Sequence, residues 1–157
     1  MTFINPVGND PQAWTSIGLG FRVDKAAATL PATATQNLFT VSGGRVAIRA
    51  IVGEVTVIVQ TQACNAKLRS TPTVGTVLDL CAALDISADE AGTLYGITGT
   101  FATALVGANA GGSVLPSLPV VVPVGVIGLN TSATNTGATK WTLWYVPLDE
   151  GALVVSA

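Results

Sequence analysis

The chain contains no histidine, and this absence removes most of the catalytic chemistry that works near neutral pH. Histidine is the usual general base there and the commonest metal ligand, and the Ser-His-Asp and Cys-His mechanisms both need it. Paired carboxylates could still act as acid and base, and the candidates are Asp85, Asp89 and Glu90, or Asp149 with Glu150. Carboxylates in polar loops are usually solvated surface groups. We therefore expect no enzyme activity, no metal and no cofactor.

Charged side chains are also scarce. The 157 residues include seven lysines and arginines and nine aspartates and glutamates, so 10% of the chain is charged and 49% is hydrophobic. Soluble domains average about 25% charged residues. A monomer of this mass exposes roughly 7300 Å², which leaves roughly 450 Å² of surface for each charge. Surfaces so poor in charge tend to be covered by a partner, and we expect a subunit of an assembly.

No segment of the sequence suits a membrane. The most apolar run, 114–129, contains Pro116, Pro119 and Pro123, and these prolines would break a membrane-spanning helix. The N-terminus lacks the basic region and apolar core of a signal peptide. The net charge is −2 and the basic residues are scattered, which argues against an electrostatic nucleic-acid interface. We expect neither membrane nor nucleic acid as a partner.

The two cysteines, Cys64 and Cys81, are too few for a disulfide scaffold. The first expectation is therefore two buried free thiols. Turn-forming residues at 70–75 predict a hairpin of strands 63–69 and 76–82. Without a bulge, this hairpin would place the two sulfurs at facing positions, so a disulfide in an oxidising setting is the alternative.

From Phe21 onward, the sequence alternates short β-branched and apolar runs with glycine, proline, asparagine or serine at intervals of about eight to twelve residues. This pattern is typical of an all-β sandwich or barrel. We expect a single antiparallel, jelly-roll-like β domain over 23–157, preceded by an extended N-terminal arm over 1–22. One short helical turn is expected at 85–90, where Ser87 and Glu90 form a capping box.

Turn residues predict two further hairpins. The first joins strands 36–41 and 45–52 through the glycine-rich turn 42–44, and the second joins strands 124–129 and 140–147 through a polar turn. The remaining expectations are strands at 54–60, 93–97 and 100–106, a bulge or tight turn at Gly53, a flexible loop at 107–113, an edge strand or extended segment at 114–123, and a last strand within 148–157.

The segment 140–147 would carry aromatic residues on both faces of a strand. Trp141, Leu143 and Tyr145 alternate on one face, whereas Trp144 lies on the other. A strand with large apolar groups on both faces is covered on both, by the core on one side and by a partner on the other. We therefore expect Trp144 and the apolar segment 114–122 at subunit contacts.

The first twenty residues combine helix-breaking residues with large apolar ones. Phe3, Ile4, Trp14 and Ile17 are candidate anchors that could dock on a neighbouring molecule. The alternative is a disordered terminus, which composition alone does not exclude. Together with Trp144, these four residues make up the predicted interface.

Four short segments of the sequence resemble segments of a known kind of protein. They are VDKAAATLP at 23–31, LFTVSGGRV at 38–46, VGEVT at 52–56 and GATKWTLWYVPLD at 137–149. These phrases resemble small virion structural proteins of tailed bacteriophages that infect actinobacteria, which are described as minor capsid or head decoration proteins. The resemblance covers roughly residues 23–150.

The resemblance implies a capsid decoration (cement) protein, made in the cytoplasm of the bacterial host and carried on the surface of the phage head. Its partners would be the major capsid protein and copies of itself, commonly in a trimer. It would bind the outer surface of the capsid lattice and stabilise the head without covalent chemistry.

Two other functions stay open. A tail-tube or other tail structural subunit of the same kind of virus would also be a histidine-poor β protein, and it would assemble by pairing of strand edges. A receptor- or carbohydrate-binding module would use exposed rings such as Trp14 and Trp144 to stack on sugars, although few polar side chains accompany these rings.

Overall fold

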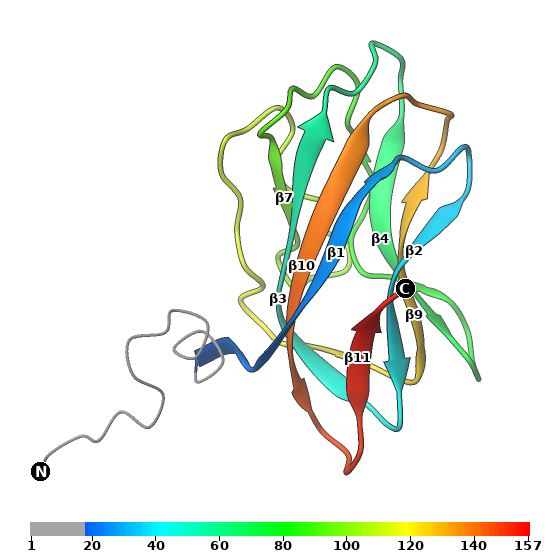
Figure 1. The fold of residues 1–157 in the computed structure, drawn as a ribbon, viewed down its shortest axis with the longest axis vertical. Helices are drawn as coiled ribbons and strands as arrows, with labels where there is room; N and C mark the ends of the chain where they lie inside the picture. Colours follow the sequence, from blue (N-terminus) through cyan, green and yellow to red (C-terminus); the bar gives the residue numbers. More distant parts are fainter. Residues whose placement is uncertain (1–17) are drawn as a thin grey trace, which may run out of the picture.

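The computed structural model describes residues 18–157, which form two antiparallel β-sheets packed face to face (Figure 1). The expected all-β fold class is thereby confirmed, with a sandwich as its architecture. In chain order the strands are β1 (Phe21–Thr29), β2 (Thr35–Ser42), β3 (Val46–Val57), β4 (Asn65–Pro72), β5 (Leu78–Asp79), β6 (Leu84–Asp85), β7 (Leu94–Gly96), β8 (Val120–Val122), β9 (Gly125–Thr131), β10 (Ala138–Pro147) and β11 (Leu153–Ser156).

The first sheet has the order β1-β10-β3, and the short strands β7 and β8 pair with successive parts of β3 on its other side. The second sheet has the order β11-β2-β9-β4, and β5 and β6 both pair with β4 at the far edge. Every pair of strands is antiparallel. β7 and β8 therefore form one edge of the first sheet, and β1 forms the other.

The core lies between the sheets and follows the expected alternation on β10. Trp141, Leu143 and Tyr145 are buried on the inner face, whereas Trp144 is half-buried on the outer face. Phe39 of β2 is fully buried from the second sheet. Burying a large apolar side chain contributes about 1.5–3 kcal/mol, so the inner face of β10 is a major source of stability.

The two hairpins predicted at 36–52 and 124–147 are wrong, because both connections cross from one sheet to the other. β2 pairs with β9 and β11 in the second sheet, while β3 pairs with β10 in the first. Turn residues show that the chain reverses. They do not distinguish a reversal within one sheet from a step to a sheet about 10 Å away.

β3 runs without interruption through Gly53, so the bulge or turn expected there is wrong. Gly53 faces the core opposite Trp141, and a Cβ at this position would lie 2.6 Å from Cη2 of the indole ring. The glycine therefore makes room for the ring. The register with β10 shifts instead at Thr56 and at Arg49, and after Arg49 it is Ile51 rather than Ala50 that continues the core face of Ile48.

The hairpin around residues 70–75 is confirmed, with Arg69 of β4 opposite Asp79 of β5. Farther along β4 the register changes, so that Ala66 lies opposite Leu84, and the two cysteines do not face each other. The thiol of Cys64 donates to the carbonyl of Ala133 (3.6 Å), and Cys81 Sγ accepts a hydrogen bond from the Leu68 amide (3.3 Å). Both are buried free thiols, and burial raises the pKa of each.

The helical turn predicted at 85–90 is also wrong. Asp85 Oδ1 accepts hydrogen bonds from the amides of Cys64 (3.1 Å) and Ser87 (3.0 Å), and Ala88 has a left-handed φ of 62°. A residue with a left-handed φ cannot belong to a right-handed helical turn, so no such turn forms here. The segment is therefore a turn held by Asp85, and these two amides lower the pKa of its carboxyl.

The other predicted strands have mixed outcomes. The strands expected at 93–97 and in the C-terminal tail are confirmed as β7 and β11, and 114–123 forms the edge strand β8 and an extended segment before it. The strand expected at 100–106 is wrong. Those residues form a loop, which single bridges attach through Ala104 to Ala82 and through Val106 to Gly96.

Candidate interaction surfaces

Three of the five carboxylates considered for catalysis have structural partners, and the other two, Glu90 and Glu150, are exposed. Asp85 holds the turn described above, and Asp89 is buried and accepts hydrogen bonds from the Tyr95 hydroxyl (2.5 Å) and the Asn109 amide (2.7 Å). Asp149 is bonded to Arg45. Within residues 18–157, no group of three or more acidic or cysteine side chains is placed to hold a metal ion. That part of the chain also contains no helix long and apolar enough to cross a membrane.

Large apolar side chains are exposed along the β7 and β8 edge of the first sheet. We call this surface the edge patch, and its side chains are between 43% and 62% exposed. The edge patch consists of Phe101, Val114, Leu115, Leu118 and Val121. These side chains come from one continuous segment and from the loop that is hydrogen-bonded to it, so they lie along the same edge of the sheet.

Close backbone contacts hold the edge patch in place. The amide and hydroxyl of Ser117 both donate to the carbonyl of Thr98, at 3.0 and 3.1 Å. A Cβ at Gly96 would lie 2.3 Å from the carbonyl oxygen of Val114, and one at Gly99 would lie 2.7 Å from that of Leu118. The two glycines let the segment lie directly on β7 and the loop after it, which fixes the positions of the exposed side chains.

A hollow of about 380 Å³ adjoins the edge patch on the outer face of the first sheet. We call it the Arg49 hollow, because Arg49 is the only ionisable residue that lines it within residues 18–157. Its lining consists of Leu19, Arg49, Leu115, Pro116, Ser117 and Pro119. Leu19 lies just before β1, so the N-terminal segment enters the domain at the rim of this hollow.

Trp144 lies on this same outer face. It is in register with Ala50 of β3, the neighbour of Arg49, and with Arg22 of β1. The Arg22 guanidinium lies 5.7 Å from the ring centroid, and the indole Nε1 is buried without a hydrogen-bond partner. Trp144 therefore lies on the same outer face of the first sheet as the Arg49 hollow, whose lining includes Leu19 and part of the segment 114–122. The anchors Phe3, Ile4, Trp14 and Ile17 lie outside the described residues.

A second apolar surface lies at one end of the sandwich. We call it the hairpin end, and its exposed side chains are Val74 and Val77 of the β4–β5 turn, Val124 and Leu148. Val74 is 88% exposed, more than any other large apolar side chain in the described part of the chain. The Thr73 amide donates to the carbonyl of Val124 (2.9 Å), so the tip of the hairpin is tied to the turn before β9.

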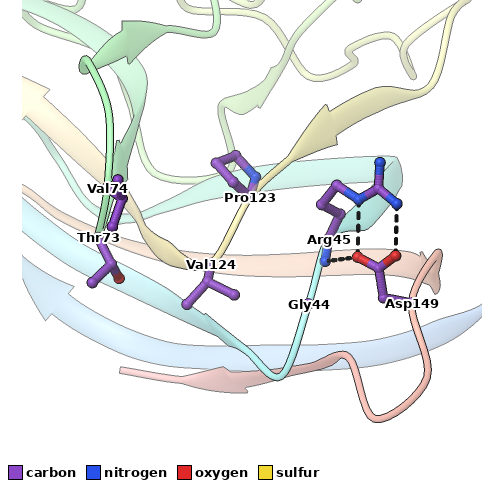
Figure 2. A pocket seen from close by; sticks show the side chains of 7 residues that line it. All are labelled: Gly44, Arg45, Thr73, Val74, Pro123, Val124 and Asp149. Atoms are coloured by element: carbon purple, nitrogen blue, oxygen red, sulfur yellow. Dashed lines mark hydrogen bonds and ion pairs between the residues drawn. The ribbon is translucent and has the colours of Figure 1, made fainter.

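The hairpin end contains a hollow of about 350 Å³ (Figure 2). Thr73, Val74, Pro123 and Val124 lie on one side of it, and Arg45 and Asp149 form the other.

Arg45 donates to both carboxylate oxygens of Asp149, from Nη2 at 2.6 Å and from Nε at 2.9 Å, and its amide donates at 2.7 Å. This arrangement holds the pKa of Asp149 well below its usual range and raises that of Arg45. Each side chain supplies hydrogen-bond partners to the other. Because Arg45 lies in the β2–β3 connection and Asp149 lies in the β10–β11 connection, the pair holds these two connections together. Nothing in the local sequence indicated a pair of residues so far apart in the chain.

No family model and no curated protein matches this chain. Among solved structures, a chain from the structure of infectious bursal disease virus, Gx strain, is similar with a TM-score of 0.23 and 12% identity. The match covers 85% of this chain and 33% of the viral one, so this chain spans about a third of that protein's length. A TM-score this low does not establish a shared fold.

Proposed function

We propose that this protein is a capsid decoration subunit, which associates with copies of itself in a trimer and binds the outer surface of the major capsid lattice of a tailed bacteriophage. The edge patch is the observation that carries the proposal. It exposes large apolar side chains on a domain in which 10% of residues are charged, and such patches on soluble proteins mark association sites. The resemblance of four sequence phrases to phage virion proteins suggests which kind of assembly this is.

The two apolar surfaces suit two different contacts. The edge patch lies along one side of the sandwich, so copies that pack through it leave the ends of the sandwich free. The hairpin end carries Val74 and its neighbouring hollow, and we assign the contact with the capsid lattice to this end. A partner that binds only the folded subunit stabilises the subunit by mass action. For the same reason, the bound subunit stabilises the folded and assembled form of the lattice.

The free edge of the first sheet favours this function over a tail tube built by pairing of strand edges. β1 has a bulge at Ala26 and Ala27, where its register with β10 shifts. Lys25, next to this bulge, donates to the carbonyl of Ala157 at the end of the chain. Bulges interrupt the ladder of hydrogen bonds and are a common means of preventing edge-to-edge pairing.

Leu118→Glu tests the contact between subunits. A glutamate in the edge patch would be buried without a partner, while loss of one leucine contact costs about 1.5–3 kcal/mol. We expect association about 10- to 100-fold weaker by sedimentation equilibrium, with an unchanged melting temperature at concentrations where both proteins are monomeric. Leu153→Glu on β11, which replaces a leucine that is 47% exposed on the other sheet, should associate like the wild type. Equal association of both variants would remove the edge patch from the interface.

Val74→Glu tests the contact with the capsid. We expect about tenfold lower occupancy on capsids that lack the protein, measured by co-sedimentation and imaging, because a charge replaces an apolar group at the contact. The mass of the free protein should not change, since Val74 is remote from the edge patch in the proposed trimer. Full occupancy by this variant would contradict the assignment of the hairpin end, and failure of the unaltered protein to bind capsids would contradict the function.

A further inference from the structure

Arg49 differs from the other basic residues of the chain. The other six all have a partner within residues 18–157: Arg22 pairs with Asp24, Arg45 with Asp149, Lys67 and Arg69 with Asp79, and Lys140 with Glu54, while Lys25 bonds a carbonyl. Arg49 makes no ion pair or side-chain hydrogen bond in that part of the chain, and it lines a hollow to which leucine and proline side chains also contribute. A guanidinium in such a setting suits a ligand that brings one carboxylate and apolar groups.

The N-terminal segment has this composition. Asp10 is the only ionisable side chain among residues 1–17, and it lies between apolar residues such as Val7 and Trp14. Leu19, which follows this segment closely, already forms one wall of the Arg49 hollow. The lining also contains Pro116 and Pro119, and proline rings can pack against aromatic side chains such as that of Trp14.

We infer that the Arg49 hollow is the socket for the N-terminal segment of a neighbouring copy, in which Asp10 pairs with Arg49. This inference rests on the self-association in the proposed function, and it names the residues that link one subunit to the next.

Length and position favour a neighbouring copy as the source of the segment. A Cβ at Gly20 would lie within 2.1 Å of the Tyr145 carbonyl oxygen, so the chain is fixed on β10 at the rim of its own hollow. Seventeen extended residues span up to about 56 Å, which exceeds the roughly 30–40 Å diameter of a domain of this size.

Charge reversal tests the pairing. Arg49→Asp and Asp10→Arg should each weaken association about tenfold, because each places two like charges together. A chain that carries both substitutions should associate like the wild type. Lys140→Asp is the matched control: Lys140 lies on the same outer face but pairs with Glu54, so it should show no coupling to Asp10→Arg. Two results would overturn the inference. One is that both single variants associate as tightly as the wild type, and the other is that the double variant is weakened by the two single effects combined.

Cross-linking tests whether the segment comes from another chain. Ser117→Cys in the hollow and Gln12→Cys near Asp10 leave the proposed ion pair intact, and the native thiols are buried. Chains with one substitution each, mixed and treated with a short bis-maleimide, should give a product of twice the monomer mass that contains both chains. A chain with neither substitution should give none.

The same reagent applied to a chain with both substitutions separates the two sources of the segment. A product of monomer mass alone would show that the segment fills its own hollow, and it would overturn the inference. Capsid binding is measured separately. Cross-linking between chains without capsid binding overturns only the proposed function, and capsid binding without cross-linking between chains overturns only this inference.

Discussion

Trp141→Ala is expected to lower the free energy of unfolding by about 3–5 kcal/mol, a large part of the 5–15 kcal/mol typical of a domain. The indole is 1% exposed and stacks on Tyr95 with ring centroids 6.2 Å apart. Its Nε1 donates to Thr139 Oγ1 at 3.1 Å, a bond buried inside the sandwich. The substitution removes this bond and leaves a cavity that the rigid sheets cannot close.

The coupling between Trp141 and Gly53 makes this prediction specific. In the wild type, Gly53→Ala would place a Cβ 2.6–2.7 Å from three ring atoms of Trp141, and we expect a cost of about 1–3 kcal/mol from overpacking. In the Trp141→Ala background the ring is gone, so Gly53→Ala should cost nothing or stabilise slightly.

Urea denaturation of the two single variants and the double variant measures this coupling. Gly111→Ala is the control, because no atom lies within 4 Å of its added Cβ, and it should change stability little in either background. Additive costs at Gly53 and Trp141 would show that the close approach of glycine and ring has no energetic consequence.

Gly53 and Trp141 also show why part of this fold could not be predicted from the sequence. Alternation of apolar residues is a local property, and it predicted most of the strands and the inner face of β10. Gly53 looked like a break in a strand because the reason for the glycine, the ring of Trp141, lies on another strand. The crossings from β2 to β3 and from β9 to β10 were missed for a related reason, since a turn sequence contains no information about the sheet that the next strand joins.

The interaction surfaces were predictable to a similar degree. Trp144 and the segment 114–122 could be chosen from the sequence one at a time, because each is apolar where solvent-facing residues are expected to be polar. The Arg49 hollow could not be found in this way. Its walls come from residues 19, 49 and 115–119, which are brought together only when β3 and the extended segment meet on the outer face of the first sheet.

Tyr95→Phe is expected to destabilise the protein by about 1–3 kcal/mol at pH 7. The Tyr95 hydroxyl donates to Oδ2 of Asp89, a carboxylate that is 2% exposed, and both side chains are held between β7 and the 107–113 loop. Phenylalanine keeps the stacking on Trp141 but leaves the buried carboxylate with one donor fewer. Burial, together with this hydrogen bond, raises the pKa of Tyr95 well above its usual range, so the tyrosine is neutral at pH 7.

The cost of Tyr95→Phe should depend on pH. Burial raises the pKa of Asp89 in the folded protein, while the bonds from Tyr95 and Asn109 oppose that rise. Removal of the Tyr95 hydroxyl should raise the pKa of Asp89 further. The variant is therefore less stable than the wild type mainly above the folded pKa of Asp89, where the carboxylate is charged. As the pH falls through the raised folded pKa of Asp89, first in the variant and then in the wild type, the folded carboxyl is protonated in both proteins and the penalty shrinks. The unfolded state is the same in both proteins and does not affect the gap between them.

Chemical denaturation of wild type and variant across pH 3–7 measures this difference. Asp79, Asp85 and Asp149, whose pKa values are lowered in the fold, destabilise both proteins alike as the pH falls, so only the gap between the two proteins is informative. Asp89→Asn in both backgrounds should remove the pH dependence of the gap. Tyr145→Phe is the control, because this tyrosine is also buried but the described residues give its hydroxyl no hydrogen-bond partner. A gap that is constant with pH would mean that Asp89 is uncharged in the folded protein at pH 7.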